Sequence, residues 1–246
     1  KPPDGYAKFV QEYIAGRFDG DAFHPETPII RNRWGGNYYA TQTFENAPNG
    51  RRVQIGWMNT GKPVWPDSFP GMPFNQQMSV PRELTYRAAP EGPRLLRYPA
   101  REIESLRGPA RSWTDLALEA TGNPLSGVRH DLLDLDMEIE PRSTSAIVLK
   151  LRDVEIVYDA AKQTLNAFNV SAPLRLRDGR FRLRALLDRA SIELFGNAGE
   201  MDLSGIIYPD PANRAVSLNT RGGPARVAHL SVWEMRSVYA GTEAAR

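Results

Sequence analysis

The chain has 246 residues, and its 31 Lys and Arg against 29 Asp and Glu leave a net charge of only +2. No basic stripe is interleaved with aromatic residues, as nucleic-acid binding would require, and no apolar run is long enough to span a bilayer. Cysteine is absent, which excludes disulfides and thiol catalysis but selects no compartment. The 20 Pro and 20 Gly, among many β-branched and aromatic residues, predict short strands joined by turns.

The first elements are expected to form one β-hairpin, in which residues 9–15 pair with residues 18–24. Asp19 and Asp21 flank Gly20 near its turn. Two acids offer far fewer oxygen ligands than a calcium site needs. The favoured interpretation is therefore a plain hairpin tip rather than a cation-binding loop.

Residues 34–83 carry three of the five Trp residues and are expected to position any ligand. Two strand-like runs, 37–44 and 52–58, flank the Pro-Asn-Gly sequence at 48–50, which predicts the turn of a β-hairpin. Residues 59–77 follow as a long loop dense in Gly, Pro, aromatic and amide residues. Such a loop on a rigid sheet is typical of a binding site. A loop that only packs on itself is the alternative.

The next elements lead to a predicted domain boundary. Residues 81–87 and 94–98 are expected to pair as strands around a turn. Residues 99–107 begin with Pro and carry early Glu residues, which favours a short helix. A Gly-Pro pair then ends the connector. Two domains are therefore predicted, residues 1–108 and residues 109–246.

The second domain is expected to be an antiparallel β-sandwich. Along residues 132–140, Leu133, Leu135, Met137 and Ile139 share one strand face and four acids share the other. A solvated sheet face is the favoured interpretation of the acids, and a site for a cation or a basic partner is the alternative. Residues 180–187 place Arg outward in the same alternating way. Further strands are predicted at 146–151, 154–159, 164–169, 191–195, 201–207, 216–219 and 229–235.

No reaction centre follows from residue spacing. His24, His130 and His229 lack the spacing of metal ligands. The sequence contains neither a nucleophile elbow nor a phosphate-binding Gly loop. Carboxylates are plentiful, but spacing nominates no pair for the face-to-face arrangement that glycoside hydrolysis needs. The sequence therefore assigns no catalytic residue, no metal site and no cofactor.

Several segments, taken in order, resemble the C-terminal half of glycoside hydrolase family 32, the invertase, levanase and inulinase group. Their shared order over most of the chain makes the resemblance specific. It implies an all-β protein, with the last blades of a five-bladed β-propeller followed by a two-sheet antiparallel β-sandwich. The segments are YIAGRFDG at 13–20, YYATQTF at 38–44, GRRVQIGWM at 50–58, MSVPRELT at 78–85, REIESL at 101–106 and DRASIELF at 188–195.

The resemblance also implies retaining cleavage of β-fructosidic bonds by three acids, which lie in Asn-Asp-Pro-Asn, Arg-Asp-Pro and Glu-Cys type motifs. None of these motifs occurs here, because Arg152-Asp153 is followed by Val154 and Cys is absent. The catalytic acids are thus expected outside this chain. Many members also place a sugar-binding Asp before the first strand of the hairpin, where this sequence has Arg-Trp-Gly-Gly-Asn at 33–37.

The resemblance assigns this chain one wall of a fructoside pocket, with residues 70–78 at the rim. Its residues would stack on a sugar face or donate and accept amide hydrogen bonds. For Tyr39 and Trp57, a place in the propeller core is an equal alternative. The residues expected to face substrate are Trp34, Asn37, Tyr39, Trp57, Phe74, Asn75 and Gln76.

A propeller fragment would leave an apolar flank exposed, so the expected partner is the missing N-terminal half or a second copy of the chain. The implied function is part of a β-fructosidase that acts on sucrose, inulin or levan. The alternatives are a truncated member that binds fructans or self-associates without catalysis, and a lectin-like role for the sandwich. The resemblance implies a secreted or periplasmic protein, although the first residues lack the apolar segment of a signal peptide.

Overall fold

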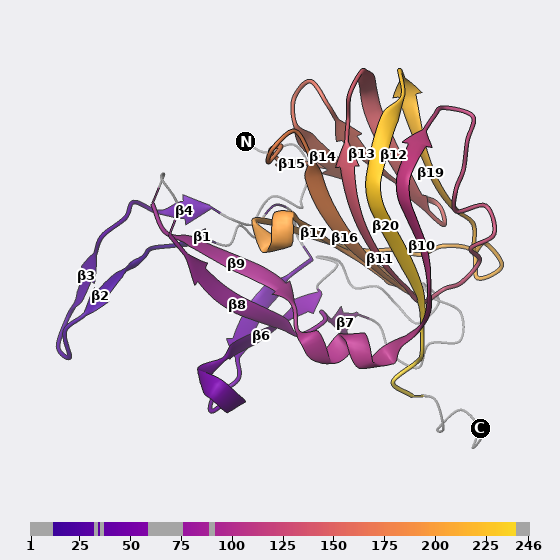
Figure 1. The fold of residues 1–246 in the computed structure, drawn as a ribbon. Coiled ribbons are helices and arrows are strands. Elements are labelled where there is room, and N and C mark those ends of the chain that lie inside the picture. The colour runs from indigo at the N-terminus through magenta and orange to yellow at the C-terminus, as the bar shows by residue number, and fades with distance from the viewer. Residues whose placement is uncertain (1–11, 32–33, 35–36, 59–75, 89–91, 240–246) are drawn as a thin grey trace.

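The computed structural model describes residues 12–31, 34, 37–58, 76–88 and 92–239. Within these residues the protein is almost entirely β, as the sequence predicts (Figure 1). Its strands form three larger sheets and two short strand pairs. The helical segments of the described chain are short 3-10 turns, and none has the length or apolarity of a transmembrane helix.

One five-stranded antiparallel sheet has the form of a propeller blade, and we refer to it as the blade. Its strands follow the order β5-β6-β8-β9, and the two-residue β7 also pairs with β6. The predicted hairpin and the predicted pair of return strands are both confirmed as parts of this sheet. The bounds are β5 (Tyr39–Thr43), β6 (Arg52–Met58), β7 (Gln77–Met78), β8 (Arg82–Arg87) and β9 (Arg94–Pro99).

The predicted sandwich is also present, as a six-stranded sheet packed on a five-stranded one. The first has the order β10 (Arg107–Leu118), β20 (Ala225–Met235), β11 (Leu133–Glu140), β16 (Phe181–Asp188), β17 (Ser191–Gly196) and β18 (Met201–Ile206). The second has the order β15 (Val170–Pro173), β14 (Thr164–Ala167), β13 (Val154–Asp159), β12 (Thr144–Leu151) and β19 (Val216–Gly222).

Apolar residues at alternate positions fill the space between these two sheets. Leu133, Leu135, Met137 and Ile139 are all buried on one face of β11, as their spacing predicts. They join a single core cluster with residues of the facing sheet, such as Leu149 of β12. The hydrophobic effect of this shared core therefore holds the sandwich together.

The first hairpin differs from the expected pairing. The structure pairs β1 (Glu12–Tyr13) with β4 (Ile30–Arg31), and β2 (Gly16–Phe18) with β3 (Phe23–Pro25). The turn therefore lies later in the chain than predicted, at residues 19–22. This hairpin projects away from the body of the protein (Figure 1).

Asp19 explains where that turn forms. Its carboxylate accepts hydrogen bonds from the backbone N–H groups of Asp21, at 2.9 Å, and Ala22, at 2.8 Å. These hydrogen bonds, with one from His24, lower the pKa of Asp19 to about 2. Residues 19–22 thus form the tip of the β2–β3 hairpin, closed by the Asp19 carboxylate.

Four strands of the described chain escaped the sequence analysis, namely β4, β7, β10 and β15. Strand β10 begins at Arg107, where Gly108 and Pro109 had suggested only the end of a connector. The register between β10 and β20 shifts between Arg107 and Ala110, so an irregular pairing accommodates Pro109. Strand β15 (Val170–Pro173) begins just after the strand predicted at 164–169, which the structure ends at Ala167. The predicted helix is the 3-10 segment η3 (Arg101–Leu106), and the other 3-10 turns are η1 (Pro48–Gly50) and η4 (Asn197–Gly199).

The favoured interpretation of the acids on β11 as a solvated row is wrong. Asp134 is fully buried and Asp136 is only 8% exposed. The alternating Arg residues of the adjacent strand β16 lie on the same face, and Arg184 donates two hydrogen bonds to Asp134, at 2.7 and 3.0 Å. Arg182 pairs with Asp136 in the same way. The acid row and the Arg row, predicted separately, thus neutralise each other across one strand pair.

Burial of Asp134 gives a direct test of this pairing. Asp134→Asn is expected to lower the free energy of unfolding by about 3 kcal/mol or more, because it removes the buried carboxylate that Arg184 and Arg107 share and leaves Arg184 only the half-exposed Glu104. The matched control is Glu138→Gln on the same strand face, whose pair with Arg180 is about 40% exposed. This control should lose less than about 1 kcal/mol in urea denaturation. Equal losses for the two variants would contradict the assignment.

Candidate functional site

The blade presents the two aromatic residues of strand β5 on opposite faces. Tyr38, just before the strand, is fully buried, and Tyr39 is 40% exposed, as the two-residue period of an extended chain requires. The Tyr38 ring lies 3.8 Å from the guanidinium carbon of Arg82, and its hydroxyl donates to Gln54 Oε1 at 3.1 Å. Burial raises the pKa of the Tyr38 hydroxyl. Tyr38 therefore anchors the strand from inside, while Tyr39 faces outward.

Gly56 of strand β6 lies directly against that buried ring. A Cβ atom at this position would approach two ring carbons of Tyr38 to 2.6 Å. Since Arg82 is stacked on the same ring, Tyr38 has little room to move. Gly56 therefore allows β6 to approach the Tyr38 ring closely on the buried face of the blade. The next residue, Trp57, points to the opposite face, beside Tyr39.

Tyr39 and Trp57 form the aromatic part of the predicted pocket wall. They are cross-strand partners in the β5–β6 register, with ring centroids 6.2 Å apart and planes tilted by 50°. Strand β7 continues this edge, because Met78 is the register partner of Trp57. Gln76 immediately precedes β7 and has a positive φ of 63°. The structure thus brings Tyr39, Trp57 and the segment that starts at Gln76 to one edge of the blade.

Trp34 and Asn37 lie toward the sandwich instead. Trp34 is partly buried and packs against the sandwich core. Asn37 is only 8% exposed, and its Oδ1 accepts a hydrogen bond from the backbone N–H of Ile206 at 3.4 Å. Phe74 and Asn75 fall outside the described residues. Of the seven predicted residues, the structure therefore places two against the sandwich and three at the edge of the blade.

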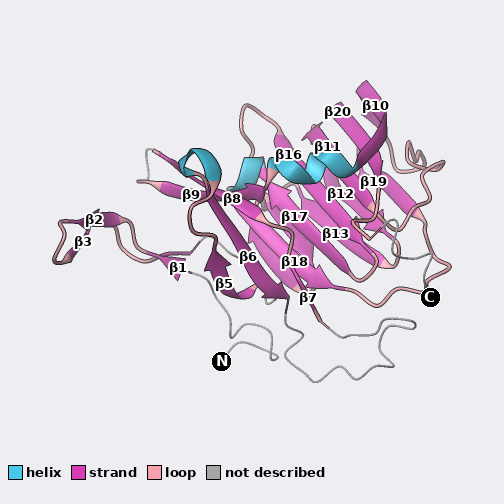
Figure 2. Cartoon of the chain, turned by 90° about the horizontal axis from the view of Figure 1, so that it is seen from below, coloured by secondary structure: helices cyan, strands magenta, loops and turns pink. Residues whose placement is uncertain are grey.

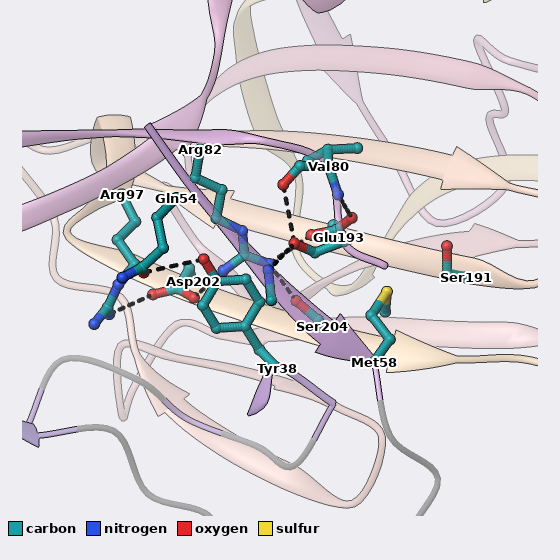
Figure 3. A network of polar contacts seen from close by, with 12 residues as sticks. Tyr38, Gln54, Met58, Val80, Arg82, Arg97, Ser191, Glu193, Asp202 and Ser204 are labelled. Carbon is teal, nitrogen blue, oxygen red and sulfur yellow. Dashed lines mark hydrogen bonds and ion pairs between the residues drawn. The ribbon is translucent and has the colours of Figure 1, made fainter. Parts of the chain in front are cut away.

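The blade is joined to the sandwich by a buried charged network around Arg82 (Figure 3). Arg82 Nη1 donates to Asp202 Oδ2, and Nη2 donates to Glu193 Oε2, each at 2.5 Å. Nη2 also donates to Ser204 Oγ at 2.6 Å. Burial opposes the charge of Arg82, but the carboxylates of Glu193 and Asp202 outweigh it and raise the pKa of the guanidinium. We call Arg82, Glu193, Asp202 and Ser204 the Arg82 network.

Both faces of strand β17 are buried because the blade covers the face opposite the core. Ile192 and Leu194 enter the sandwich core, whereas Glu193 and Phe195 face the blade, where Phe195 contacts Tyr98 at a centroid distance of 6.0 Å. Figure 2 shows the blade strands lying against the β17–β18 end of the six-stranded sheet. The sequence analysis missed this interface. A signal was available, because alternation along β17 places the acidic Glu193 on the same strand face as the apolar Phe195.

The network carboxylates are structural rather than catalytic. Glu193 and Asp202 are at most 3% exposed, and both bind Arg82. Retaining glycosidases need one carboxylate free to attack the sugar and one protonated group to assist departure. Carboxylates that are buried from solvent and bound to Arg82 cannot reach a sugar, so they meet neither condition. Within the described part of the chain, these two buried acids therefore stabilise the interface and perform no hydrolysis.

The blade docked on a two-sheet sandwich places the protein among the all-β proteins that combine a propeller with a sandwich. Comparison with known proteins then gives the family. The profile "Glycosyl hydrolases family 32 N-terminal domain" matches residues 3–99. The profile "Glycosyl hydrolases family 32 C terminal" matches residues 102–234, more than half of the chain. The chain belongs to glycoside hydrolase family 32, as its resemblance to that family implied.

Among curated proteins, the chain is similar to a levanase of Bacillus subtilis (strain 168), with 30% identity over 94% of this chain and 38% of the levanase. It is also similar to an extracellular exo-inulinase of Aspergillus awamori, with 24% identity over 96% of this chain and 50% of the inulinase. The chain therefore spans half or less of the length of these relatives.

Solved structures confirm the fold. The crystal structure of exo-inulinase from Aspergillus awamori superposes with a TM-score of 0.77 at 21% identity, over 92% of this chain and 50% of that one. A β-fructofuranosidase from Schwanniomyces occidentalis complexed with fructosyl-erythritol superposes with a TM-score of 0.73 at 17% identity, over 93% and 53%. At these identities the likeness establishes architecture alone.

The contact between Gly56 and Tyr38 can be tested by adding one methyl group. Gly56→Ala is expected to lower the free energy of unfolding by about 1–3 kcal/mol, because the ring held beneath Arg82 cannot withdraw without strain. The matched control is Gly122→Ala, since a Cβ there would meet nothing within 4 Å. Urea denaturation measures both variants. A Gly56→Ala protein as stable as the control would show that the ring is free to shift.

Proposed function

We propose that this chain is the C-terminal part of a β-fructosidase of family 32 that hydrolyses fructosides such as sucrose, inulin or levan. The observation that carries the proposal is the match of both family profiles, in order, to a blade and a sandwich joined through buried charges. Relatives named as levanase and exo-inulinase support the substrate class. In this proposal residues 1–108 belong to the propeller and residues 109–246 form the sandwich.

The chain contributes binding surface, and the catalytic acids come from outside it. None of the three acid motifs of the family occurs in the sequence. Cleavage with retention requires a nucleophile and an acid/base about 5 Å apart, and the buried acids described above are committed to Arg82. A completed propeller therefore has to supply the three acids, opposite the wall that this chain provides.

Tyr39 and Trp57 are the centre of the proposed wall. Tilted aromatic rings at an exposed blade edge offer an apolar face on which a fructose ring can stack. Gln76 adds an amide group to the proposed wall, and Phe74 and Asn75, which lie outside the described residues, belong to the proposed set. Trp34 and Asn37 complete the proposed set on the side next to the sandwich, where Asn37 is also held by the Ile206 N–H.

The projecting hairpin supports a partner for this chain. Its large apolar side chains are exposed, with Phe18 at 67% and Phe23 at 50% as direct register partners. Exposed aromatic pairs of this kind mark an interface. We assign that interface to the remaining part of the propeller, and a second copy of the chain is the competing occupant. The exo-inulinase relative is named as extracellular, and we extend that location to this protein.

Hydrolysis by the native protein tests the proposal. The protein carrying this chain should be isolated from its own cells through a C-terminal tag, and its mass and N-terminal sequence determined. It should release fructose from at least one of sucrose, inulin and levan, and the purified 246-residue chain should release none. Hydrolysis by the 246-residue chain alone would show that the acids lie within it. No hydrolysis by the native protein would leave a non-catalytic fructan-binding role.

The aromatic wall can be tested separately in the same native protein. Tyr39→Ala is expected to raise KM for the fructoside about tenfold, because it removes a stacking ring worth about 1 kcal/mol or more. Tyr86→Ala is the matched control, since Tyr86 is a 63% exposed tyrosine on the same blade. Initial-rate kinetics should show no change in KM for this control. Equal effects of the two substitutions would remove Tyr39 from the wall.

A further inference from the structure

We propose that the sandwich positions the sugar-facing wall of the blade, with Ser191 and Glu193 of strand β17 as positioning residues. This inference deepens the proposed function and rests on it. It assigns the sandwich a part in substrate binding, through hydrogen bonds to blade segments that carry the wall. The evidence consists of contacts that cross the interface, and Figure 3 shows those that Glu193 makes with Val80 and Arg82.

The first contact holds strand β7. Ser191 Oγ lies 2.6 Å from Gln77 Nε2 and accepts its hydrogen bond. The same amide nitrogen lies 3.6 Å from Met58 Sδ, and Gln77 is the register partner of Met58. Since Ser191 is only 3% exposed, this hydrogen bond is shielded from water. Strand β17 thus fixes the short strand that lies beside Trp57 and follows directly on Gln76.

The second contact holds the backbone a few residues further on. Glu193 Oε1 accepts a hydrogen bond from the backbone N–H of Val80 at 2.7 Å, while its Oε2 binds Arg82. Ser79 contributes from within the blade, because its Oγ accepts from the Gly56 N–H at 3.1 Å. The segment from Gln77 to Arg82 is therefore bound at four points, three of which include side chains of strand β17.

The third contact holds the other strand of the wall. Asn37 accepts a hydrogen bond from Ile206 of strand β18, and Tyr38 is covered by Arg82, which is itself bound to Glu193 and Asp202. Tyr39 follows these two residues directly. The strands on both sides of the Tyr39–Trp57 pair are thus fixed by neighbouring sandwich strands, β17 and β18.

Position matters here because β7 has only two residues and gains little from its own pairing. A wall residue displaced by about 1 Å loses much of its binding contribution, and a wall that must be ordered on binding weakens affinity. Removing one tether should therefore loosen residues 77–80 and weaken substrate binding, while the sandwich core and the chemistry of the bond cleavage remain as they were.

The test compares Ser191→Ala with Ser231→Ala in the intact native protein. Ser231 is a matched control, because it is 4% exposed on the same six-stranded sheet and its Oγ lies 2.8 Å from Ser112 Oγ and 3.0 Å from His229 Nε2, away from the blade. Ser191→Ala should speed hydrogen exchange of the amides at 77–80 about fivefold. It should also raise KM about fivefold with kcat unchanged. The control should change neither quantity, although it removes two side-chain hydrogen bonds and Ser191→Ala removes one.

Two further results decide the inference. Gln77→Ala should reproduce both effects, and the double variant should add nothing to them, because the two substitutions break the same hydrogen bond. Exchange at 77–80 that is equal in the Ser191→Ala and Ser231→Ala proteins would overturn the proposal. Hydrogen exchange needs no enzyme activity, so a protein that hydrolyses no fructoside would refute the proposed function while the exchange data still decide whether β17 fixes the wall.

Discussion

The buried charge of Arg82 is the constraint on which this structure depends. A guanidinium with no exposure to water is tolerated only where acceptors surround it, and here Glu193, Asp202 and Ser204 supply them from two strands of the sandwich. A buried ion pair adds little stability compared with an apolar contact. Its value is geometric, because a planar guanidinium meets two carboxylates in few arrangements. The network thereby fixes how the blade sits on the sandwich.

Because the blade is fixed in this way, neighbouring residues of one strand can have different roles, one in packing and one in the proposed binding surface. In extended chain the side chains alternate, so Tyr38 packs beneath Arg82 while Tyr39 faces outward beside Trp57. Gly56 permits the close approach of Tyr38, and the next residue is Trp57 itself. The same interface that stabilises the protein therefore orients the proposed sugar-facing residues.

Local sequence patterns predicted most strands and their buried faces. They could not predict which strands pair or which side chains meet across a sheet. Alternation of Leu133, Leu135, Met137 and Ile139 located a strand and its buried face, because the period reports burial directly. It could not tell that Asp134 faces Arg184 of another strand rather than water, since register is set by partners elsewhere in the chain. Strand β10 was missed because a Gly-Pro pair is typical of a connector. Here Gly108 and Pro109 lie instead at an irregular strand pairing.

The site shows the same limit. The aromatic and amide residues of the hairpin and loop marked one edge of the blade as a binding surface, but Arg82 and its partners are separated by 111 residues for Glu193 and 120 for Asp202. No local pattern joins residues so far apart. Arg82 and Glu193 lie within two of the family-like segments, 78–85 and 188–195, and the structure shows that these segments contact each other through this pair.

The most direct measurement is a double-mutant cycle across the interface, with Arg82→Met, Glu193→Met and the double variant, using free energies of unfolding from urea. Each single substitution should be strongly destabilising, because Arg82→Met removes the cation between two buried carboxylates and Glu193→Met leaves Arg82 with one carboxylate in place of two. The account predicts that the double variant loses at least about 2 kcal/mol less than the sum of the single losses. Losses that add within about 0.5 kcal/mol would contradict it, because the blade and the sandwich would then not be joined through this pair.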